Sequence, residues 1–317
     1  MDQTTRGNFD LRYCLGDLRL FRVRFRACIV HQPFDPAAAS LSLPSAPEIP
    51  KDVNLLVYAG QHIAEKLPMI HATRRAICYI RNQSANHYID LAGTFEEYLK
   101  GFSSKTRSTL QRKLRKIADM AEHTLECRAY RAPASVDEFH RLGRQVAVKT
   151  YQEKLFGGAL PASEEFVRRV RSLAQDDRLR GFILLIKGEP IAYLYLPVEG
   201  GALVYGYLGY DPDYASWSPG TVLLYLALEQ LFAEQRFRYF NFTHGEGQVK
   251  ELFGRATFLQ ADMCFFRWTL RNALAVYSHT AVDWCSSKIG RTLEMLGLRQ
   301  RIRKLLRRVP SAKAQAA

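Results

Sequence analysis

Apolar and polar side chains alternate along much of the first ninety residues. The run LRLFRVRFRA, within residues 11–30, has the period of two that predicts a strand. Shorter apolar runs predict further strands at 53–60, 76–80 and 86–91, the last of them weaker. A short helix is expected at 61–67, and five prolines predict an extended surface loop over 33–50. This part of the chain is therefore predicted to be mostly sheet.

From Thr94 the apolar residues recur with the period of a helix. N-capping residues stand before four such runs: Thr94, Ser103 or Ser104, Ser135 and Ser163. Glu97 and Glu138 follow the first and third of these caps by three residues, which is the spacing of a capping box. The second run contains one apolar stripe, formed by Leu110, Leu114, Ile117 and Ala121.

The period returns to two at residue 181. The next thirty residues predict three consecutive strands with short turns between them. A helix at 219–235 and a strand at 237–242 follow, then a short helix, one or two strands, and a helical C-terminal segment. Strands and helices in this order predict a mixed α/β (α+β) fold.

Length and composition suit two packed units, because the chain has 317 residues of which 47% are hydrophobic. No run of about 18 apolar residues predicts a transmembrane helix, and the N-terminus lacks the apolar segment of a secretory signal. The six cysteines form no CxxC pair and no metal-ligand spacing. We therefore expect reduced thiols, a cytoplasmic location and no bound metal.

Positive charge is concentrated in two segments. Residues 101–120 carry six basic side chains against Asp119, and residues 286–308 carry eight against Glu294, so together they hold +12 of the net +14. Such patches indicate a local anionic partner: phosphates, a membrane surface or nucleic acid. Within 290–310, leucines can share one helix face, which is typical of peripheral contact with an anionic membrane. A docked terminal helix is the alternative.

The stretch GYDPDYASWSPGTVLLYLALEQ, residues 209–230, begins a very apolar helix with a polar, proline-containing loop. Ser218 is a suitable N-cap, Pro219 suits the first turn, and Gly220 lets another molecule approach the backbone. The N–H groups of a first turn, together with the helix dipole, form an anion-binding site. The alternative is that this loop only starts a core helix.

Residues 94–255 resemble the acyl-CoA N-acyltransferase (GNAT) superfamily, and in particular the bacterial branch related to the cellulose-biosynthesis protein CelD and the FemAB peptidoglycan transferases. Two motifs carry the resemblance: Tyr210-Asp211-Pro212 with Tyr214 and Ser218-Pro219-Gly220, and Phe240-Asn241-Phe242 with Gly245-Glu246 and Lys250. Asn241 stands where this branch usually has aspartate.

The resemblance implies a GNAT-like fold of two tandem lobes. A degenerate, strand-rich lobe would span 1–132 and end in a basic helix pair, a catalytic lobe would span 133–270, and a basic helical extension 271–317. The co-substrate would be acetyl-CoA or a longer acyl-CoA, and the acceptor an amine. The strand 203–209 would splay from its neighbour and receive the pantetheine arm. The implied donor-binding residues are Leu208, Gly209, Tyr210, Ser218, Pro219, Gly220 and Thr221.

Acyl transfer to an amine needs a base, an oxyanion site and a proton donor for the thiolate. Glu246 is the expected base and His244 its rival, because both lie just past a strand of an α/β sheet. The alternative is that Glu246 caps the short helix after it. Tyr207 and Tyr205 are predicted to share one strand face, and either could donate the proton, with Tyr207 as the preferred donor. The alternative is that these tyrosines only pack in the sheet. Substrate contacts are expected from Lys250, Asn241 and Tyr151.

Two other functions stay open. A Fem-type aminoacyl-tRNA transferase would place the basic helix at 104–118 on RNA phosphates. A non-enzymatic module that binds nucleic acid would explain the charge, but it would not explain the DPDYASWSPG loop.

Overall fold

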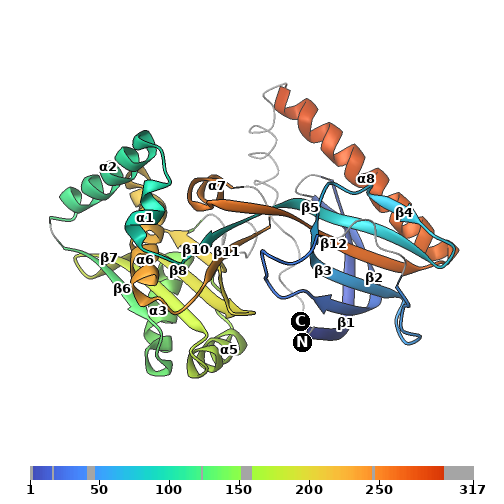
Figure 1. Cartoon of the computed structure of the whole chain (residues 1–317), viewed down its shortest axis with the longest axis horizontal. Coiled ribbons are helices and arrows are strands. Elements are labelled where there is room, and N and C mark those ends of the chain that lie inside the picture. The colour runs from blue at the N-terminus through green and yellow to red at the C-terminus, as the bar shows by residue number, and fades with distance from the viewer. Residues whose placement is uncertain are drawn as a thin grey trace, which may run out of the picture. The chain divides into compact units, whose positions relative to one another are not determined.

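The computed structural model describes residues 3–15, 18–40, 47–122, 124–150, 159–244 and 247–295. The chain folds into two compact units, which are labelled by their elements in Figure 1. The first unit contains 1–32, 40–83 and 261–317, and the second contains 33–39 and 84–260. Strands β5 and β12 each run from one unit into the other.

The first unit is built on the strand order β1-β2-β3-β12-β5, with β4 paired to β5. Its elements are β1 Gln3–Leu15, β2 Leu18–His31, β3 Leu55–Ile63, β4 Ile70–Ala72, β5 Ala76–Asp90, β12 Ala256–Arg267 and helix α8 Leu270–Met295. Strands β1 and β2 form an antiparallel hairpin, and β2 runs parallel to β3. Small residues of α8 pack on this sheet, among them Ala273, Ala275 and Val276.

Three sequence predictions for the first ninety residues are wrong. The alternating run at 11–30 is divided between two antiparallel strands, of which the first ends at Leu15 and the second begins at Leu18. The helix expected at 61–67 does not form, since β3 continues to Ile63. The two strands predicted at 76–80 and 86–91 are a single long strand, β5.

The second unit has the strand order β5-β11-β9-β8-β7-β6, with β10 paired to β8 alone. Its other strands are β6 Leu125–Tyr130, β7 Leu179–Ile186, β8 Glu189–Glu199, β9 Ala202–Val204, β10 Tyr207–Tyr210 and β11 Tyr239–His244. Its helices are α1 Phe95–Lys100, α2 Ser104–Met120, α3 Val136–Ala147, α5 Glu164–Gln175, α6 Pro219–Glu234 and α7 Gln248–Phe253.

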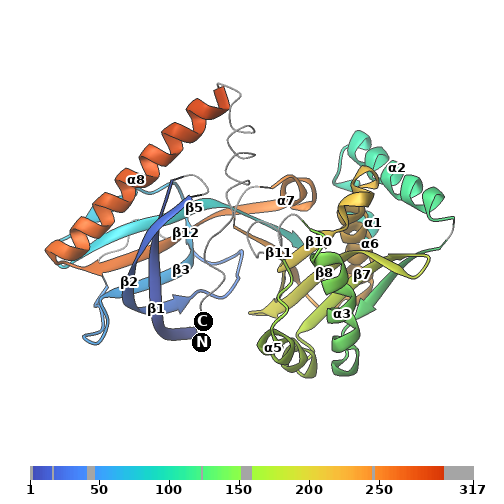
Figure 2. The same cartoon turned by 180° about the vertical axis from the view of Figure 1, so that it is seen from behind.

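The central strands of this unit are buried on both faces, so the unit has three layers: a sheet with helices on each side. Along β7, Phe182 and Leu184 pack into one apolar cluster with α2 and α6, whereas Ile183 and Leu185 pack into another with α3 and α5. The near-continuous apolar runs of β7 and β8 follow from this double burial. Figure 1 shows the side of the sheet that carries α1, α2 and α6, and Figure 2 shows α3 on the other side.

Three of the predicted helix caps are confirmed. Thr94 accepts from the Glu97 N–H at 3.2 Å while Glu97 accepts from the Thr94 N–H at 2.8 Å, which is a complete capping box. Ser103 and Ser163 cap α2 and α5 through their hydroxyl oxygens. Ser135 does not cap α3, because its hydroxyl donates to the Ala132 carbonyl at 2.8 Å.

The boundaries between the two compact units differ from the predicted lobe boundaries after residues 132 and 270. In particular, the helices α1 and α2 belong to the second unit and pack beside α6. The predicted lobes were defined by resemblance to a GNAT fold, whereas the compact units are defined by contacts within the structure. The division into lobes at 1–132, 133–270 and 271–317 therefore stays a prediction.

Candidate active site

The site begins where the sheet of the second unit opens. Leu203 and Val204 of β9 pair with Phe240 and Asn241 of β11 in parallel, and the Tyr205 N–H makes a last bond to the Asn241 carbonyl at 2.9 Å. After that bond the chain continues as β10, which pairs with β8 only. One edge of β10 is therefore without a strand partner among the described residues.

A β-bulge causes this divergence. The Gly206 N–H donates to the Tyr195 carbonyl at 3.1 Å, and Tyr207 also stands opposite Tyr195 in the register, so two residues face one. A bulge bends its strand and raises the local twist, which turns β10 away from β11. The prediction that this strand splays is in agreement with the observed pairing.

The direction of the β10 backbone groups follows from the ladder. The Asp211 N–H donates to the Ile191 carbonyl at 2.8 Å, so Asp211 faces β8. In an antiparallel pair alternate residues face the partner, so Gly209 and Tyr207 also direct their N–H groups to β8. Leu208 and Tyr210 then direct theirs into the opening. This edge offers backbone donors and acceptors to a ligand.

Gly209, the residue before the motif, has a packing role that the sequence does not reveal. The Tyr193 side chain is fully buried and passes directly over Gly209, so a Cβ there would lie 2.7 Å from the Tyr193 hydroxyl oxygen and would overlap the ring. The same hydroxyl accepts from the Leu160 N–H at 3.3 Å. Gly209 therefore lets β10 approach a buried tyrosine.

The loop after β10 is held by a buried carboxylate. Asp211 is 3% exposed, and its Oδ1 accepts from the Asp213 N–H at 3.1 Å at the start of the 3₁₀ helix Pro212–Trp217. Its Oδ2 binds the Lys149 ammonium at 2.7 Å, and this hydrogen bond raises the pKa of Lys149. Asp211 thus ties the loop to the end of α3. Its place in the motif is explained by this structural role.

The first turn of α6 differs from the expected capping arrangement. Ser218 is the N-cap residue, but it is in the left-handed conformation at φ 56° and its side chain makes no capping bond. Pro219 has no N–H, and the Thr221 N–H is bonded to the Ser218 carbonyl at 3.0 Å. Among the described residues no acceptor faces the Gly220 N–H. The turn therefore offers one backbone donor rather than a row of them.

Gly220 also packs more tightly than the sequence suggested. A Cβ at this position would lie 2.9 Å from Leu208 Cδ2 and 3.3 Å from Tyr210 Cδ1. The absence of a side chain thus allows α6 to approach β10 of its own chain. The predicted role in donor binding stays a prediction.

The end of β11 forms the other wall of the opening. Asn241 is 8% exposed, and its Oδ1 accepts from the Thr243 N–H at 2.7 Å, which supports Thr243 in the left-handed conformation. An aspartate would accept the same bond, so the replacement of aspartate by asparagine preserves the turn. Lys250 of α7 donates to Thr243 Oγ1 at 3.4 Å, and burial lowers the pKa of Lys250.

The two candidate tyrosines lie on opposite faces of the sheet, which corrects the prediction that they share one. Tyr205 packs near Phe240 and Phe242 in the α6 cluster, whereas Tyr207 packs against Phe166 in the α3–α5 cluster. The bulge at Gly206 inverts the alternation between them. Burial raises the pKa of Tyr205, which keeps its phenol protonated at neutral pH.

Some predicted site residues lie outside the described residues. Glu246 and Tyr151 are among them, and of His244 only the backbone position at the end of β11 is described. No group of three His, Cys, Asp or Glu side chains that could hold a metal ion occurs in the described part of the chain. The structure thus brings Leu208, Tyr210 and Gly220 together beside the opening.

Part of the sequence that forms this site matches a known protein family. Residues 104–251 match the family model described as acetyltransferase (GNAT) domain. No curated protein shows a significant match.

Three solved structures illustrate the distant similarity. A conserved protein of unknown function from Bacteroides thetaiotaomicron is 12% identical over 61% of this chain and 63% of its own, with a TM-score of 0.43. The C-terminal domain of a putative lysylphosphatidylglycerol synthetase from Agrobacterium fabrum is 12% identical over 82% and 85%, with a TM-score of 0.47. FemX is 10% identical over 58% and 61%, with a TM-score of 0.42. The chain thus spans less than two thirds of the length of the Bacteroides protein and of FemX. All three TM-scores are below 0.5, so we draw no functional conclusion from these structures.

Residues 104–251, slightly less than half of the chain, thus match a GNAT-type acetyltransferase domain, and the mixed α/β architecture is GNAT-like. The divergence of β10 from β11, the bulge and the buried helix α6 lie within the matched residues.

The packing of Gly209 can be tested by substitution. We expect Gly209→Ala to lower the free energy of unfolding by about 1–3 kcal/mol, because the new methyl group would overlap the Tyr193 ring. Gly7→Ala is the matched control, since no atom lies within 4 Å of a Cβ built there. Urea unfolding of both variants provides the measurement. Equal stability of the two variants would contradict the packing role.

Proposed function

We propose that the protein is an acyl-CoA-dependent N-acyltransferase, which moves an acyl group from a thioester to an amine. The observation that supports this most directly is the open edge of β10, where Leu208 and Tyr210 present backbone groups beside β11. The pantetheine arm carries two amides that such an edge can bind, much as a further strand would. The donor diphosphate would lie near the Gly220 N–H at the start of α6.

Backbone donors at this edge would also polarise the thioester carbonyl. An N–H that is fixed by a sheet needs no reorganisation when negative charge develops on the carbonyl oxygen. Leu208 is the best-placed residue for this role, because its N–H faces the opening. The amine would then attack the polarised carbon, and the thiolate would leave with a proton from Tyr207.

The deprotonation of the amine is assigned to Glu246, with His244 as its rival. His244 ends β11, and Glu246 comes two residues later in the sequence. Lys250, Asn241 and Tyr151 are proposed to bind the substrate, Asn241 through the turn that it stabilises. The family resemblance further supports a cytoplasmic enzyme of the FemAB-like branch that acts on a cell-envelope or exopolysaccharide precursor. An aminoacyl-tRNA donor is the competing proposal.

A pair of substitutions tests the backbone donor. Leu208→Pro and Leu208→Ala both remove the leucine side chain, but only proline also removes the N–H that faces the opening. We expect kcat to be about 10²–10³-fold lower for Leu208→Pro than for Leu208→Ala, the typical effect of losing one oxyanion donor. Acetyl transfer to a panel of amines provides the measurement. If the two variants have equal kcat and similar melting temperatures, Leu208 does not supply this donor.

The base can be tested independently. Glu246→Gln should lower kcat by about 10²–10⁴-fold and leave the Kd for CoA nearly unchanged, because a base acts on the acceptor. Steady-state kinetics and calorimetry measure the two effects separately. An inactive His244→Ala enzyme beside an active Glu246→Gln enzyme would assign the base to His244 instead.

We further propose that the protein binds the surface of an anionic membrane, at its inner face, through α8. Large apolar side chains with helical spacing are exposed on this helix, including Leu270 at 88%, Leu274 at 70% and Trp284 at 63%. Lys288 lies 5.5 Å from the Trp284 ring, and such a mixture of tryptophan and basic residues suits an anionic interface. Within the described residues, no helix has the length and apolar character needed to span a bilayer. The basic segment at 290–310 that first suggested a membrane lies outside the described side chains.

Vesicle flotation tests this proposal. The full chain should float with anionic vesicles at low salt, and a Leu274→Glu/Trp284→Glu variant should float several-fold less because its apolar face is interrupted. Met69→Glu is the control, since Met69 is also exposed but lies on a loop outside α8. If the double variant and the control float equally, α8 is not the membrane contact.

A further inference from the structure

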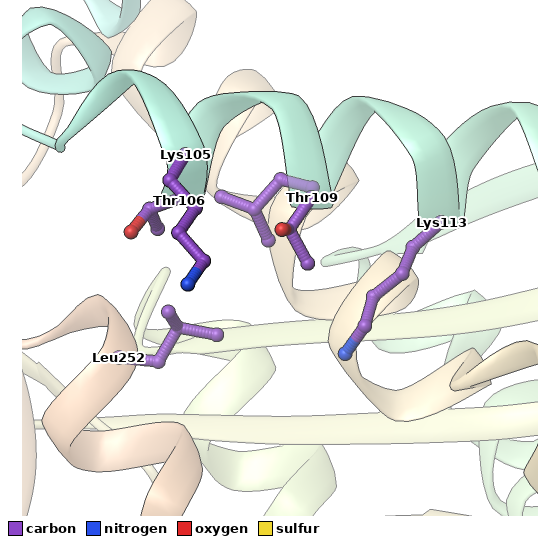
Figure 3. Close-up of a pocket in the computed structure, with 6 residues that line it drawn as sticks. Lys105, Thr106, Thr109, Lys113 and Leu252 are labelled. Carbon is purple, nitrogen blue, oxygen red and sulfur yellow. The ribbon is translucent and has the colours of Figure 1, made fainter.

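A cavity of about 170 Å³ lies between α2 and α7 in the second unit. It is lined by Lys105, Thr106, Thr109, Leu110, Lys113 and Leu252. Figure 3 shows Lys105 and Lys113 extending from α2 on the side where Leu252 of α7 lies. Two lysines and two threonines thus line the cavity, although the Thr106 hydroxyl is already hydrogen-bonded to the Ser103 hydroxyl at 2.9 Å, and no acidic residue lines it.

The charge of this cavity is not neutralised within the described residues. Neither Lys105 nor Lys113 has an acidic partner there, whereas Lys149 and Lys187 of the same unit are paired with Asp211 and Glu122. Two ammonium groups beside hydroxyl donors match the oxygens of a phosphate group.

The cavity is connected to the candidate active site through α2. Lys116 lies three residues after Lys113 on the same helical side, and its ammonium donates to the Ser216 carbonyl at 3.1 Å. Ser216 lies on the loop that follows β10, and Leu252 lies on the helix that follows β11. One wall of the cavity therefore belongs to the helix that follows β11, and α2, which forms the rest of the lining, also contacts the loop that follows β10.

The distance along α2 between Lys116, at the loop after β10, and the lysines of the cavity suits a ligand of nucleotide size. From Lys105 to Lys116 the helix rises about 17 Å at 1.5 Å per residue, with Thr109 and Lys113 between them on one side. A ligand that starts at the α6 turn beside this loop can thus follow α2 to the cavity. Coenzyme A carries its diphosphate and its 3′-phosphate on the same ribose, so the two groups lie close together. If the diphosphate lies at the α6 turn, the 3′-phosphate can lie at the Lys113 end of the cavity, which is about 5 Å along α2 from Lys116.

We propose that the α2–α7 cavity is a phosphate-binding subsite that recognises the 3′-phosphate of the acyl-CoA donor through Lys105 and Lys113. This inference rests on the proposed function, because it requires that CoA is the donor. It assigns to the basic helix α2 a role in donor recognition. The leucines at 110 and 252 provide the apolar walls of the subsite.

The experiment compares CoA with dephospho-CoA, which lacks only the 3′-phosphate. Isothermal titration calorimetry is performed on the wild-type chain, on Lys105→Gln/Lys113→Gln and on the control Lys187→Gln. The control also removes a positive charge from the second unit, but its lysine is paired with Glu122 and lies outside the cavity. The melting temperature of each variant shows that it is folded.

We expect the wild type and the control to bind CoA about tenfold more tightly than dephospho-CoA, and the double variant to bind both with similar affinity. The preference should also decrease as salt is added, because the contacts are accessible to water. If wild type binds both ligands equally, or the double variant keeps the preference, the subsite is excluded although CoA remains the donor.

Two other outcomes are distinguishable. If the wild type binds neither ligand, the proposed function fails and this inference fails with it. If the double variant keeps its preference for CoA but loses affinity for tRNA, then the cavity contacts nucleic acid and the assignment to CoA is overturned. Binding of tRNA therefore belongs in the same series of measurements.

Discussion

The bulge that sets Gly206 and Tyr207 opposite the single residue Tyr195 is the constraint on which the candidate site depends. Without the extra residue, the strand would continue beside β11 as it begins at Leu203 and Val204. The two strands would then stay paired, and their backbone N–H and C=O groups would be hydrogen-bonded to each other. With the bulge, β10 keeps its ladder to β8 and exposes its second edge.

The surrounding structure supports this geometry by dense packing. Tyr193 occupies the space over Gly209, and the side chains of Leu208 and Tyr210 occupy the space over Gly220. Asp211 and Lys149 then fix the loop between β10 and α6. Removal of Lys149 would leave a buried carboxylate whose one remaining partner among the described residues is the Asp213 N–H, and a buried unpaired charge is costly. Gly209, Asp211 and Gly220 are thus required for the shape of the site before any ligand is considered.

The sequence predicted the parts of the fold that depend on local pattern. The double burial of β7 and β8 follows from their unbroken apolar runs, and Thr94, Ser103 and Ser163 cap their helices as expected. The double burial and the caps depend on side chains close in sequence, which makes them accessible to periodicity and spacing. The opening of the sheet is also found, but it was expected only from the family resemblance.

The remaining features depend on contacts that no local pattern encodes. A bulge requires knowledge of the partner strand, so Tyr205 and Tyr207 were placed on one face although Gly206 separates them onto two. Ser218 has the residue type of a cap, but the left-handed backbone needed after the 3₁₀ helix directs its side chain elsewhere. Ser135 also has the residue type of a cap but does not cap its helix, because its hydroxyl donates to the Ala132 carbonyl. The pairing of Asp211 with Lys149 joins residues that are 62 positions apart.

The central claim is that the free edge of β10 receives the acyl-CoA donor. Residue-resolved hydrogen–deuterium exchange tests it most directly, because the two sets of amides in one short strand have different partners. In the free protein, the amides of Leu208 and Tyr210 should exchange faster than those of Tyr207 and Gly209, which bond to β8. Saturating CoA should slow the exchange of Leu208 and Tyr210 selectively. Unchanged exchange at these two amides, under conditions where calorimetry detects bound CoA, would contradict the account.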